Sequence, residues 1–338
     1  MKISNPTTQT ILAPATPDPQ TSGNPIQYLP VALFGSTVAL SGLAIAWKLS
    51  IKLYGAPPII SNIITIFAWA VFVILFLGYL YKIIAFPERV KAELTHPITA
   101  NFLGTFFISA VLLSGLAAPY SLLLARITWV VGTLGGIAFV YTLTHRLFKG
   151  DLSSLDLVPP MLIPGLTILN AVTAHASIDL GWWSAAADQM LFSIGIVYVM
   201  VFFVIITYRL VHLEQVTLFL KPSLLLMSAP FEVGLLSYLS TRNKIDDFST
   251  VLFFFGLFIF IVLFFIVFDR KLPFMVSWWG ACFSMGALTN GSLQFARLSE
   301  IHFVRVISIV LLILVNILIL TTLVQTIRYL FTGRLLKP

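Results

Sequence analysis

Glu232 is the residue whose chemistry stands out, because this carboxyl group lies inside a long apolar segment, two residues after Pro230. If the segment crosses a bilayer, a charged acid near its centre costs about 2.5–3.5 kcal/mol on insertion scales, so a functional role is the first hypothesis. Ionised in a pore it would repel anions, and protonated it would donate a hydrogen bond, which makes Glu232 a candidate pH-sensitive site. The structural alternative places Glu232 outside any pore, satisfying backbone groups near Pro230 or pairing with a basic residue.

The other reactive side chains form no recognisable catalytic or metal-binding motif. Cys282 is the single cysteine, which excludes an intrachain disulfide and a cysteine-based metal cluster. The five histidines lie on or near different segments, and the sequence contains no HExxH, P-loop, G-x-S-x-G or DDxxD motif. We therefore expect no metal, no cofactor and no enzymatic activity.

The segments that must position Glu232 are those of a membrane protein. The chain is 59% hydrophobic and only 10% charged, with a mean hydropathy of +0.99, and most of its ten apolar stretches reach the roughly 20 residues that a span needs. Every second stretch contains proline, and these are residues 28–49, 96–116, 158–176, 222–239 and 272–293. The stretches between them contain none, and these are residues 59–84, 121–148, 188–210, 250–268 and 301–331.

This alternation predicts which helices face lipid. An interrupted helix survives in a bilayer only where protein or water satisfies the backbone groups that proline leaves unpaired. We predict an all-α polytopic membrane protein whose ten transmembrane helices form five helical hairpins, in a quasi-fivefold arrangement around a central pore. Pro30, Pro97, Pro164 and Pro230 are candidate kink or pore residues, although proline also favours the first turn of an ordinary helix. Gly132 and Gly136 form a GxxxG contact that lies within or between subunits.

The ends of the chain and its charges predict the orientation. Residues 1–27 are rich in Thr, Pro, Ser, Gln and Asn and read as a disordered tail, followed by a membrane domain over 28–333 and a short tail over 334–338. With both tails inside, the 20 Lys and Arg residues divide into 13 on the inner side and 7 on the outer side. The positive-inside rule therefore predicts cytoplasmic termini, and the net charge of +7 marks orientation rather than a nucleic-acid partner.

Several short motifs resemble the superfamily of the tellurite-resistance protein TehA and the plant guard-cell slow anion channels. The stretch from Pro273 to Phe283 resembles the ninth helix of that superfamily, in which an aromatic-rich pattern, F-x-x-x-[WY]-W-x-x-x-F, ends in a phenylalanine that plugs the pore. The resemblance covers essentially the whole chain after the tail. Its other elements are Phe34-Gly35, Trp47, Glu93 to Pro97 with Phe102, Leu220 to Pro222, and Ala229-Pro230.

The resemblance implies a homotrimer in a membrane, expected to be a bacterial inner (plasma) membrane, in which each subunit has its own pore. It implies a channel for small monovalent anions such as chloride and nitrate, with Phe283 as the gate. The alternative is a proton-coupled or exporter-type carrier of organic acids, sulfite or tellurite. Interrupted helices would attract anions through backbone dipoles, and neutral donors would add to this attraction. Further candidate pore-lining residues are Phe34, Gly35, Phe102, Asn170, Ser277 and Gly280.

Overall fold

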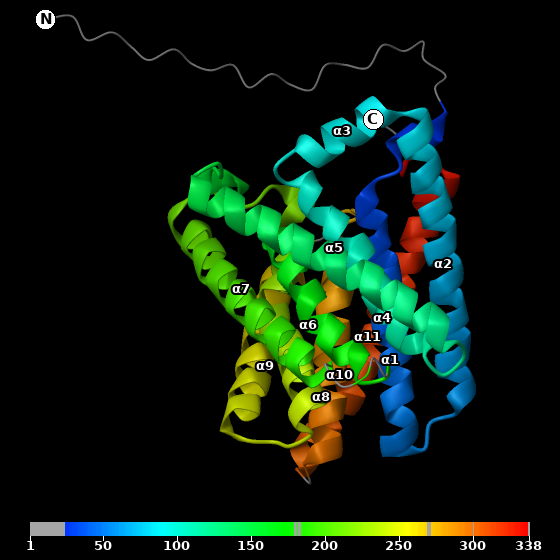
Figure 1. Cartoon of the computed structure of the whole chain (residues 1–338), viewed down its shortest axis with the longest axis vertical. Helices are drawn as coiled ribbons and strands as arrows, with labels where there is room; N and C mark the ends of the chain where they lie inside the picture. Colours follow the sequence, from blue (N-terminus) through cyan, green and yellow to red (C-terminus); the bar gives the residue numbers. More distant parts are fainter. Residues whose placement is uncertain (1–23, 179–180, 182–183, 269–271, 300, 337–338) are drawn as a thin grey trace, which may run out of the picture.

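Helices make up all the regular structure of the residues that the computed structural model describes, which are 24–178, 181, 184–268, 272–299 and 301–336. Five of the helices alternate along the chain with five others, and a short helix, α3 (Pro87–Thr95), follows the second of them (Figure 1). The first set, which we call the inner helices, comprises α1 (Phe34–Tyr54), α4 (Gly104–Ala117), α6 (Ile163–His175), α8 (Ala229–Arg242) and α10 (Trp278–Leu298). The outer helices are α2 (Pro58–Ala85), α5 (Leu122–Lys149), α7 (Ser184–His212), α9 (Asp247–Phe268) and α11 (His302–Phe331).

The outer helices are long and uninterrupted, because proline occurs in them only in the first turn of α2, where no backbone hydrogen bond is lost. Only 22–33% of the residues in their most apolar stretches are buried. Large apolar side chains such as Ile66, Val251 and Ile313 are therefore exposed. Such a surface is stable only against lipid or another apolar surface.

The inner helices begin differently, since four of them follow a 3₁₀ helix. These segments are η2 (Val31–Leu33), η3 (Thr99–Leu103), η5 (Pro159–Leu162) and η6 (Leu218–Met227), and α10 follows a turn at Val276 and Ser277. A 3₁₀ turn tightens the backbone where proline prevents a regular α-helix. The inner segments that begin at η2, η3 and η6 are 72–83% buried in their most apolar stretches, so their apolar side chains pack against protein.

Contacts between helices follow a regular order. Helix α1 packs against α4 and α10, α4 packs against α6, and α8 packs against both α6 and α10. Each inner helix also packs against the outer helix that follows it in the chain. In Figure 1, α3 and the start of α1 lie at the upper end of the molecule.

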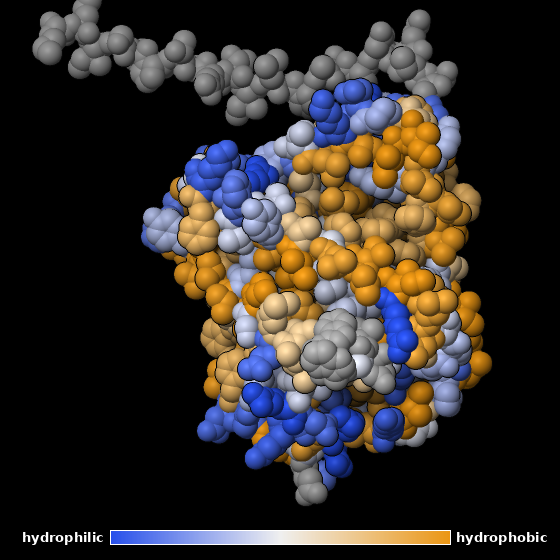
Figure 2. Space-filling model, in the orientation of Figure 1, coloured by the Kyte–Doolittle hydropathy of each residue, from blue (hydrophilic) through white to orange (hydrophobic). Residues whose placement is uncertain are grey.

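Within the described part of the chain, eight helical segments are long and apolar enough to cross a membrane, which indicates an integral, polytopic membrane protein. The two remaining long segments are inner ones: α6 has 13 residues, and α10 carries buried polar residues such as Thr289, Asn290 and Ser292. On the face drawn in Figure 2, hydrophobic residues cover most of the middle of the molecule and hydrophilic residues gather toward its two ends. This distribution is the one that a bilayer selects.

Two differences from the sequence prediction concern segment boundaries. Residues 1–23 of the expected tail, and 337–338 of the second tail, lie outside the described residues, whereas Pro25–Tyr28 form a 3₁₀ helix capped by the side chain of Asn24. The first helix that the structure describes therefore begins at Pro25. The amphipathic helix α3 was not predicted, because its charged sequence has no apolar stretch of spanning length.

Candidate functional site

A narrow cavity lies between the inner segments, and we call it the axial cavity. Its volume is about 20 Å³, room for about one water molecule. All five inner segments contribute to its wall, and none of the lining residues is charged. The lining residues are Ala32, Gly35, Val38, Phe102, Thr105, Ile108, Ile163, Leu226, Val276, Trp279, Gly280 and Phe283.

Phe283 lines this cavity from α10, and its side chain is 8% exposed. Trp279 and Gly280 line the cavity from the preceding turn, as expected for positions three and four residues apart on a helix. On the other side, a methyl group added at the buried Gly286 would meet no atom within 4 Å. Phe283 therefore lines the axial cavity, and open space lies beside α10 at Gly286, one turn further along the helix.

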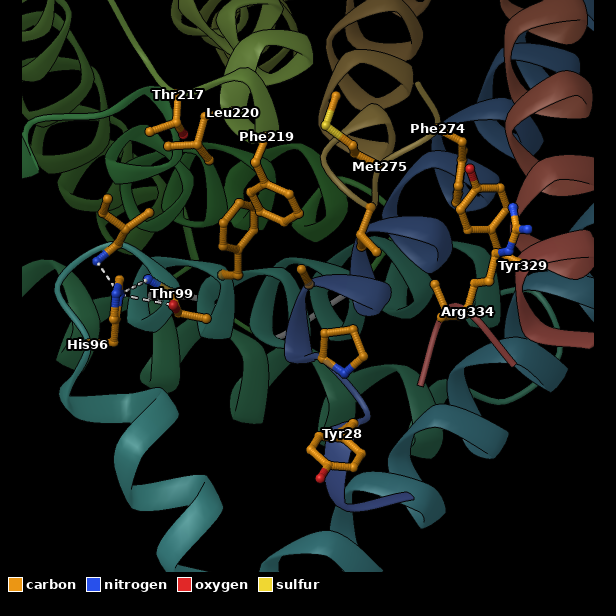
Figure 3. A pocket seen from close by; sticks show the side chains of 16 residues that line it. Tyr28, His96, Thr99, Thr217, Phe219, Leu220, Phe274, Met275, Tyr329 and Arg334 are labelled. Atoms are coloured by element: carbon orange, nitrogen blue, oxygen red, sulfur yellow. Dashed lines mark hydrogen bonds between the residues drawn. The ribbon is translucent and has the colours of Figure 1, made fainter. Parts of the chain in front are cut away.

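A wider cavity of about 480 Å³, which we call the vestibule, lies at one end of the axial cavity (Figure 3). Ala32, Phe102 and Val276 line both cavities, so the two are adjacent. Residues from both ends of the described chain, Tyr28 and Arg334, line the vestibule. Both ends of the described part of the chain therefore lie on the same side of the protein.

Several polar side chains that line the vestibule can donate hydrogen bonds to a ligand. His96 Nδ1 accepts hydrogen bonds from the backbone N–H groups of Ile98 and Thr99, both at 3.2 Å, so the proton of a neutral ring is on Nε2. Arg334 reaches the opposite side of the vestibule in Figure 3. Its position depends on Gly333, whose φ of 64° turns the chain back so that the Arg334 N–H bonds the Tyr329 carbonyl. A guanidinium, an imidazole and several hydroxyls can hold an anion there.

A buried ion pair fixes the segment around Pro30 that leads into α1. Lys82 Nζ of α2 lies 2.7 Å from Glu93 Oε2 of α3, and their side chains are only 5% and 10% exposed. Lys82 also donates to the Leu29 carbonyl at 2.8 Å, and Glu93 Oε1 accepts the Val31 N–H at 2.9 Å. This cluster, which we call the Lys82–Glu93 latch, anchors the start of the first inner segment to α2 and α3.

The predicted proline positions do not share one role. Pro30 lines the vestibule, and Pro97 precedes η3, where its carbonyl accepts a hydrogen bond from Asn101. Pro164 and Pro230 were predicted as kink or pore residues, but the structure places them in the first turns of α6 and α8. Proline costs little in a first turn, so these two positions need no pore to explain them.

Of the other predicted residues, Gly35, Phe102, Gly280 and Phe283 line the axial cavity, while three do not line either cavity. Phe34 packs edge-on against Phe72 of α2 with ring centroids 5.8 Å apart. Asn170 donates from its side-chain amide to the Leu166 carbonyl of its own helix. Ser277 donates to the Phe219 carbonyl and so joins the start of α10 to η6.

Glu232 is buried between α8 and α9 and does not line either cavity. Its side chain is 2% exposed, and a methyl group added at Gly256 of α9 would lie 3.5 Å from Glu232 Cγ. Neither carboxyl oxygen has a hydrogen-bond partner among the described residues. No basic residue pairs with Glu232 there, so carrying a charge at this position would be costly.

Sequence reasoning missed most of the residues that line the axial cavity. The signal was present as three-residue spacing: Ala32, Gly35 and Val38 line it from one segment, and Thr105 and Ile108 follow Phe102 in another. Sequence reasoning also missed a pair of residues, His175 and Asp188, that no local sequence pattern indicates. His175 Nδ1 lies 2.8 Å from the carboxylate of Asp188, thirteen residues away and across a loop.

Several known proteins are similar to this chain over most of its length. A plant S-type anion channel, SLAH4 of Arabidopsis thaliana, is 28% identical over 306 residues, covering 85% of this chain and 81% of its own length. A tellurite resistance protein TehA homolog of Haemophilus influenzae is 23% identical over 302 residues, covering 87% and 90%. The guard cell S-type anion channel SLAC1 of Arabidopsis thaliana is 24% identical over 323 residues, which are 91% of this chain and 57% of that protein. Residues 28–327 match the voltage-dependent anion channel family, and the chain belongs to that family.

Proposed function

We propose that the protein is a passive channel for small monovalent anions such as chloride and nitrate, with Phe283 as its gate. The observation that carries this proposal is the axial cavity, which all five inner segments line and whose wall includes Phe283. The path would run from the vestibule through the axial cavity and past the Phe283 ring. At the family level, the relatives named as S-type anion channels support the same activity.

The dimensions of the cavity support a closed state. An opening that holds about one water molecule cannot pass a hydrated anion, and its uncharged wall favours loss of water. Rotation of the Phe283 side chain away from its preferred conformation costs about 0.5–1.5 kcal/mol. The displaced ring would move toward the open space beside Gly286, one turn further along α10. A modest input of free energy would therefore open the path.

Anion selectivity would come from weak and distributed attraction. No Lys or Arg lines the axial cavity, so an anion would bind there only weakly and could leave again. Backbone N–H groups at the starts of the inner helices provide partial positive charge instead. Arg334 and His96 would raise the local concentration of anions in the vestibule.

We extend the proposal to the whole assembly. All ten long helices would cross the membrane, including α6 and α10, as five hairpins in quasi-fivefold order around the path. The order of contacts from α1 through α4, α6, α8 and α10 back to α1 supports this arrangement. The channel would be a homotrimer with one path in each subunit, and the vestibule with both termini would face the cytoplasm of a bacterial inner membrane.

A second candidate function, a proton-coupled or exporter-type carrier of organic acids, sulfite or tellurite, is kept for one reason. Glu232 is a buried carboxyl group without a partner among the described residues, as a proton-coupling site would be. The TehA homolog of Haemophilus influenzae is named for tellurite resistance. The position of Glu232 against α9, away from both cavities, favours the channel.

Two-electrode voltage clamp in oocytes tests the proposal by comparing wild type with Phe283→Ala in chloride and nitrate baths. Removing the ring should increase the anion current about tenfold, since a gate of about 1.4 kcal/mol corresponds to that factor. Phe258→Ala is the control, because Phe258 is 58% exposed on α9, lines neither cavity and should not affect the current. Silence of both wild type and Phe283→Ala, or a current that follows the proton gradient, would overturn the proposal.

A further inference from the structure

A second groove, of about 580 Å³, lies between the outer helices α7 and α9 near their C-terminal ends. Two of the α9 residues in its wall, Phe265 and Ile266, are 68% and 56% exposed, so the groove opens toward the lipid-facing surface. We call it the α7–α9 groove. It is lined by Leu210, Gln215, Val216, Lys221, Leu224, Leu263, Phe265, Ile266, Val267 and Leu272.

The inner wall of this groove is also a wall of the vestibule. Lys221 and Leu224 of η6 line the groove, while Phe219 and Leu220 of the same 3₁₀ helix line the vestibule. Both cavities therefore lie at the same end of the protein. The groove faces lipid where the vestibule faces the aqueous phase.

The groove combines apolar walls with a cation, Lys221, that has no ion pair among the described residues. All of its lining residues are apolar except Gln215 and Lys221. Lys221 is partly buried and forms no ion pair among the described residues, and the exposed Glu214 nearby does not pair with it. Arg209 precedes Leu210 on α7, is 5% exposed, and has no hydrogen-bond partner for Nε or Nη1 within the described part of the chain. Two cations without a described counter-charge lie at this end of α7 and η6.

We propose that the α7–α9 groove binds an anionic phospholipid, with an acyl chain along its apolar wall and the phosphate at Lys221. Basic groups between membrane helices at the level of the headgroups attract anionic lipid, and each contributes measurably to the affinity. A zwitterionic lipid fills the same apolar volume but brings its own cation, so it lacks the net charge that Lys221 attracts. The groove therefore discriminates by headgroup charge.

Bound lipid would act on the path through η6, and this step rests on the function proposed above. The Ser277 hydroxyl donates to the Phe219 carbonyl of η6. Leu226, at the other end of η6, would lie 3.4 Å from a methyl group added at Gly280, one turn before Phe283. A lipid that stabilises η6 would therefore stabilise the start of α10 and the closed position of Phe283.

Lipid binding to the purified full-length protein tests the site without any transport measurement. Native mass spectrometry would follow dioleoyl phosphatidylglycerol and dioleoyl phosphatidylcholine, which differ only in headgroup. Lys221→Gln should lower the affinity for phosphatidylglycerol about fivefold and leave phosphatidylcholine unchanged, while Lys221→Arg should restore the preference. Lys149→Gln is the control, because the Lys149 side chain is 63% exposed at the end of α5 and does not line the groove.

A second variant tests the apolar part of the groove. Ile266→Trp adds a bulky ring to an exposed groove residue and should lower binding of both lipids, whereas Ile261→Trp, on the exposed surface of α9 outside the groove, should not. Equal binding of phosphatidylglycerol to wild type and Lys221→Gln, or unchanged binding to Ile266→Trp, would overturn the site. Intact lipid discrimination with no effect of Phe283→Ala on current would instead overturn the channel and leave the lipid site standing.

Discussion

The inner and outer helices use apolar residues in opposite ways. Outer helices such as α9 run without interruption and expose most of their apolar side chains, with 28% of the most apolar stretch buried. The inner segment of η6 and α8 is 83% buried in its corresponding stretch, and begins with a 3₁₀ helix. Hydrophobicity alone therefore does not identify the core of a membrane protein. Backbone irregularity and small polar residues identify the segments that protein surrounds.

The largest expected effect on stability is in the Lys82–Glu93 latch, which anchors the first inner segment to the outer helix α2 and to α3. Glu93→Gln keeps the shape of the side chain but leaves the buried Lys82 ammonium without its counter-charge. Breaking a buried pair in this way costs about 3–5 kcal/mol. We expect a clear fall in the melting temperature of the detergent-solubilised protein, measured by thermal unfolding.

The matched control is the exposed pair of Lys149 and Asp151, whose side chains are 63% and 45% exposed. Asp151→Asn should change stability by less than about 1 kcal/mol, because water already solvates both groups. Equal melting temperatures for wild type and Glu93→Gln would contradict the idea that a buried pair holds the first inner segment in place.

Two glycines, one on the outer helix α5 and one on the inner helix α10, differ in how closely other helices approach them. A methyl group added at Gly132 of α5 would lie 2.6 Å from Val111 Cγ2 and 2.8 Å from the Phe107 carbonyl oxygen of α4. Backbone cannot move aside as a side chain can, so Gly132→Ala should destabilise the protein by about 1–3 kcal/mol. Gly286→Ala on α10 meets no atom within 4 Å and should be tolerated. Thermal unfolding of both variants measures the difference, and similar losses would contradict it.

The sequence did not determine whether the contact at Gly132 and Gly136 lies within one subunit or between subunits. Gly132 faces Phe107 and Val111, and Gly136 lies against Thr167 of α6, so this GxxxG contact lies within the chain.

A smaller effect is expected at Glu232. The carboxyl lies against α9 and outside both cavities, so Glu232→Gln should keep the anion current within about twofold of wild type, equivalent to about 0.4 kcal/mol. Currents at acidic and neutral pH would measure this, with Phe283→Ala as the positive control. Loss of proton-dependent uptake in Glu232→Gln would instead favour the coupled carrier, and would mean that the inner helices couple to α9 during transport.

The sequence predicted the class of fold well, because its signals are local. Uninterrupted apolar stretches predicted α2, α5, α7, α9 and α11 with boundaries within a few residues, since lipid tolerates apolar residues on every face of a helix. Proline identified the inner segments but did not predict where each segment changes from a 3₁₀ helix to an α-helix. The predicted stretch over residues 96–116 contains η3, and α4 begins only at Gly104, because a 3₁₀ turn and an α-helix share the same residue preferences.

The candidate site was harder to predict than the fold, because its contacts join distant segments. The backbone N–H of Val31 donates to Glu93 Oε1, and these two residues are 62 positions apart in the sequence. Trp279 lines the axial cavity only because α10 packs against α1. The two helices are so close that a methyl group added at Gly35 would lie 3.1 Å from Trp279 Cβ. Such pairs follow from packing that no single segment encodes.

The smallest expected effect concerns the turn that leads from an inner helix, α8, to an outer one, α9. The backbone N–H of Ser249 donates to Asp246 at 3.0 Å, and this bond, with one from the Tyr238 hydroxyl, lowers the pKa of the Asp246 carboxyl below its usual value of 3.8. A lowered pKa means that the ionised cap stabilises the folded state above that value, and that this contribution is lost as the pH falls through the pKa of the folded protein. The melting temperature of wild type should exceed that of Asp246→Asn slightly at neutral pH, and the two should converge in strong acid. A gap that stays constant with pH would show that the start of α9 depends on packing against α8 rather than on its cap.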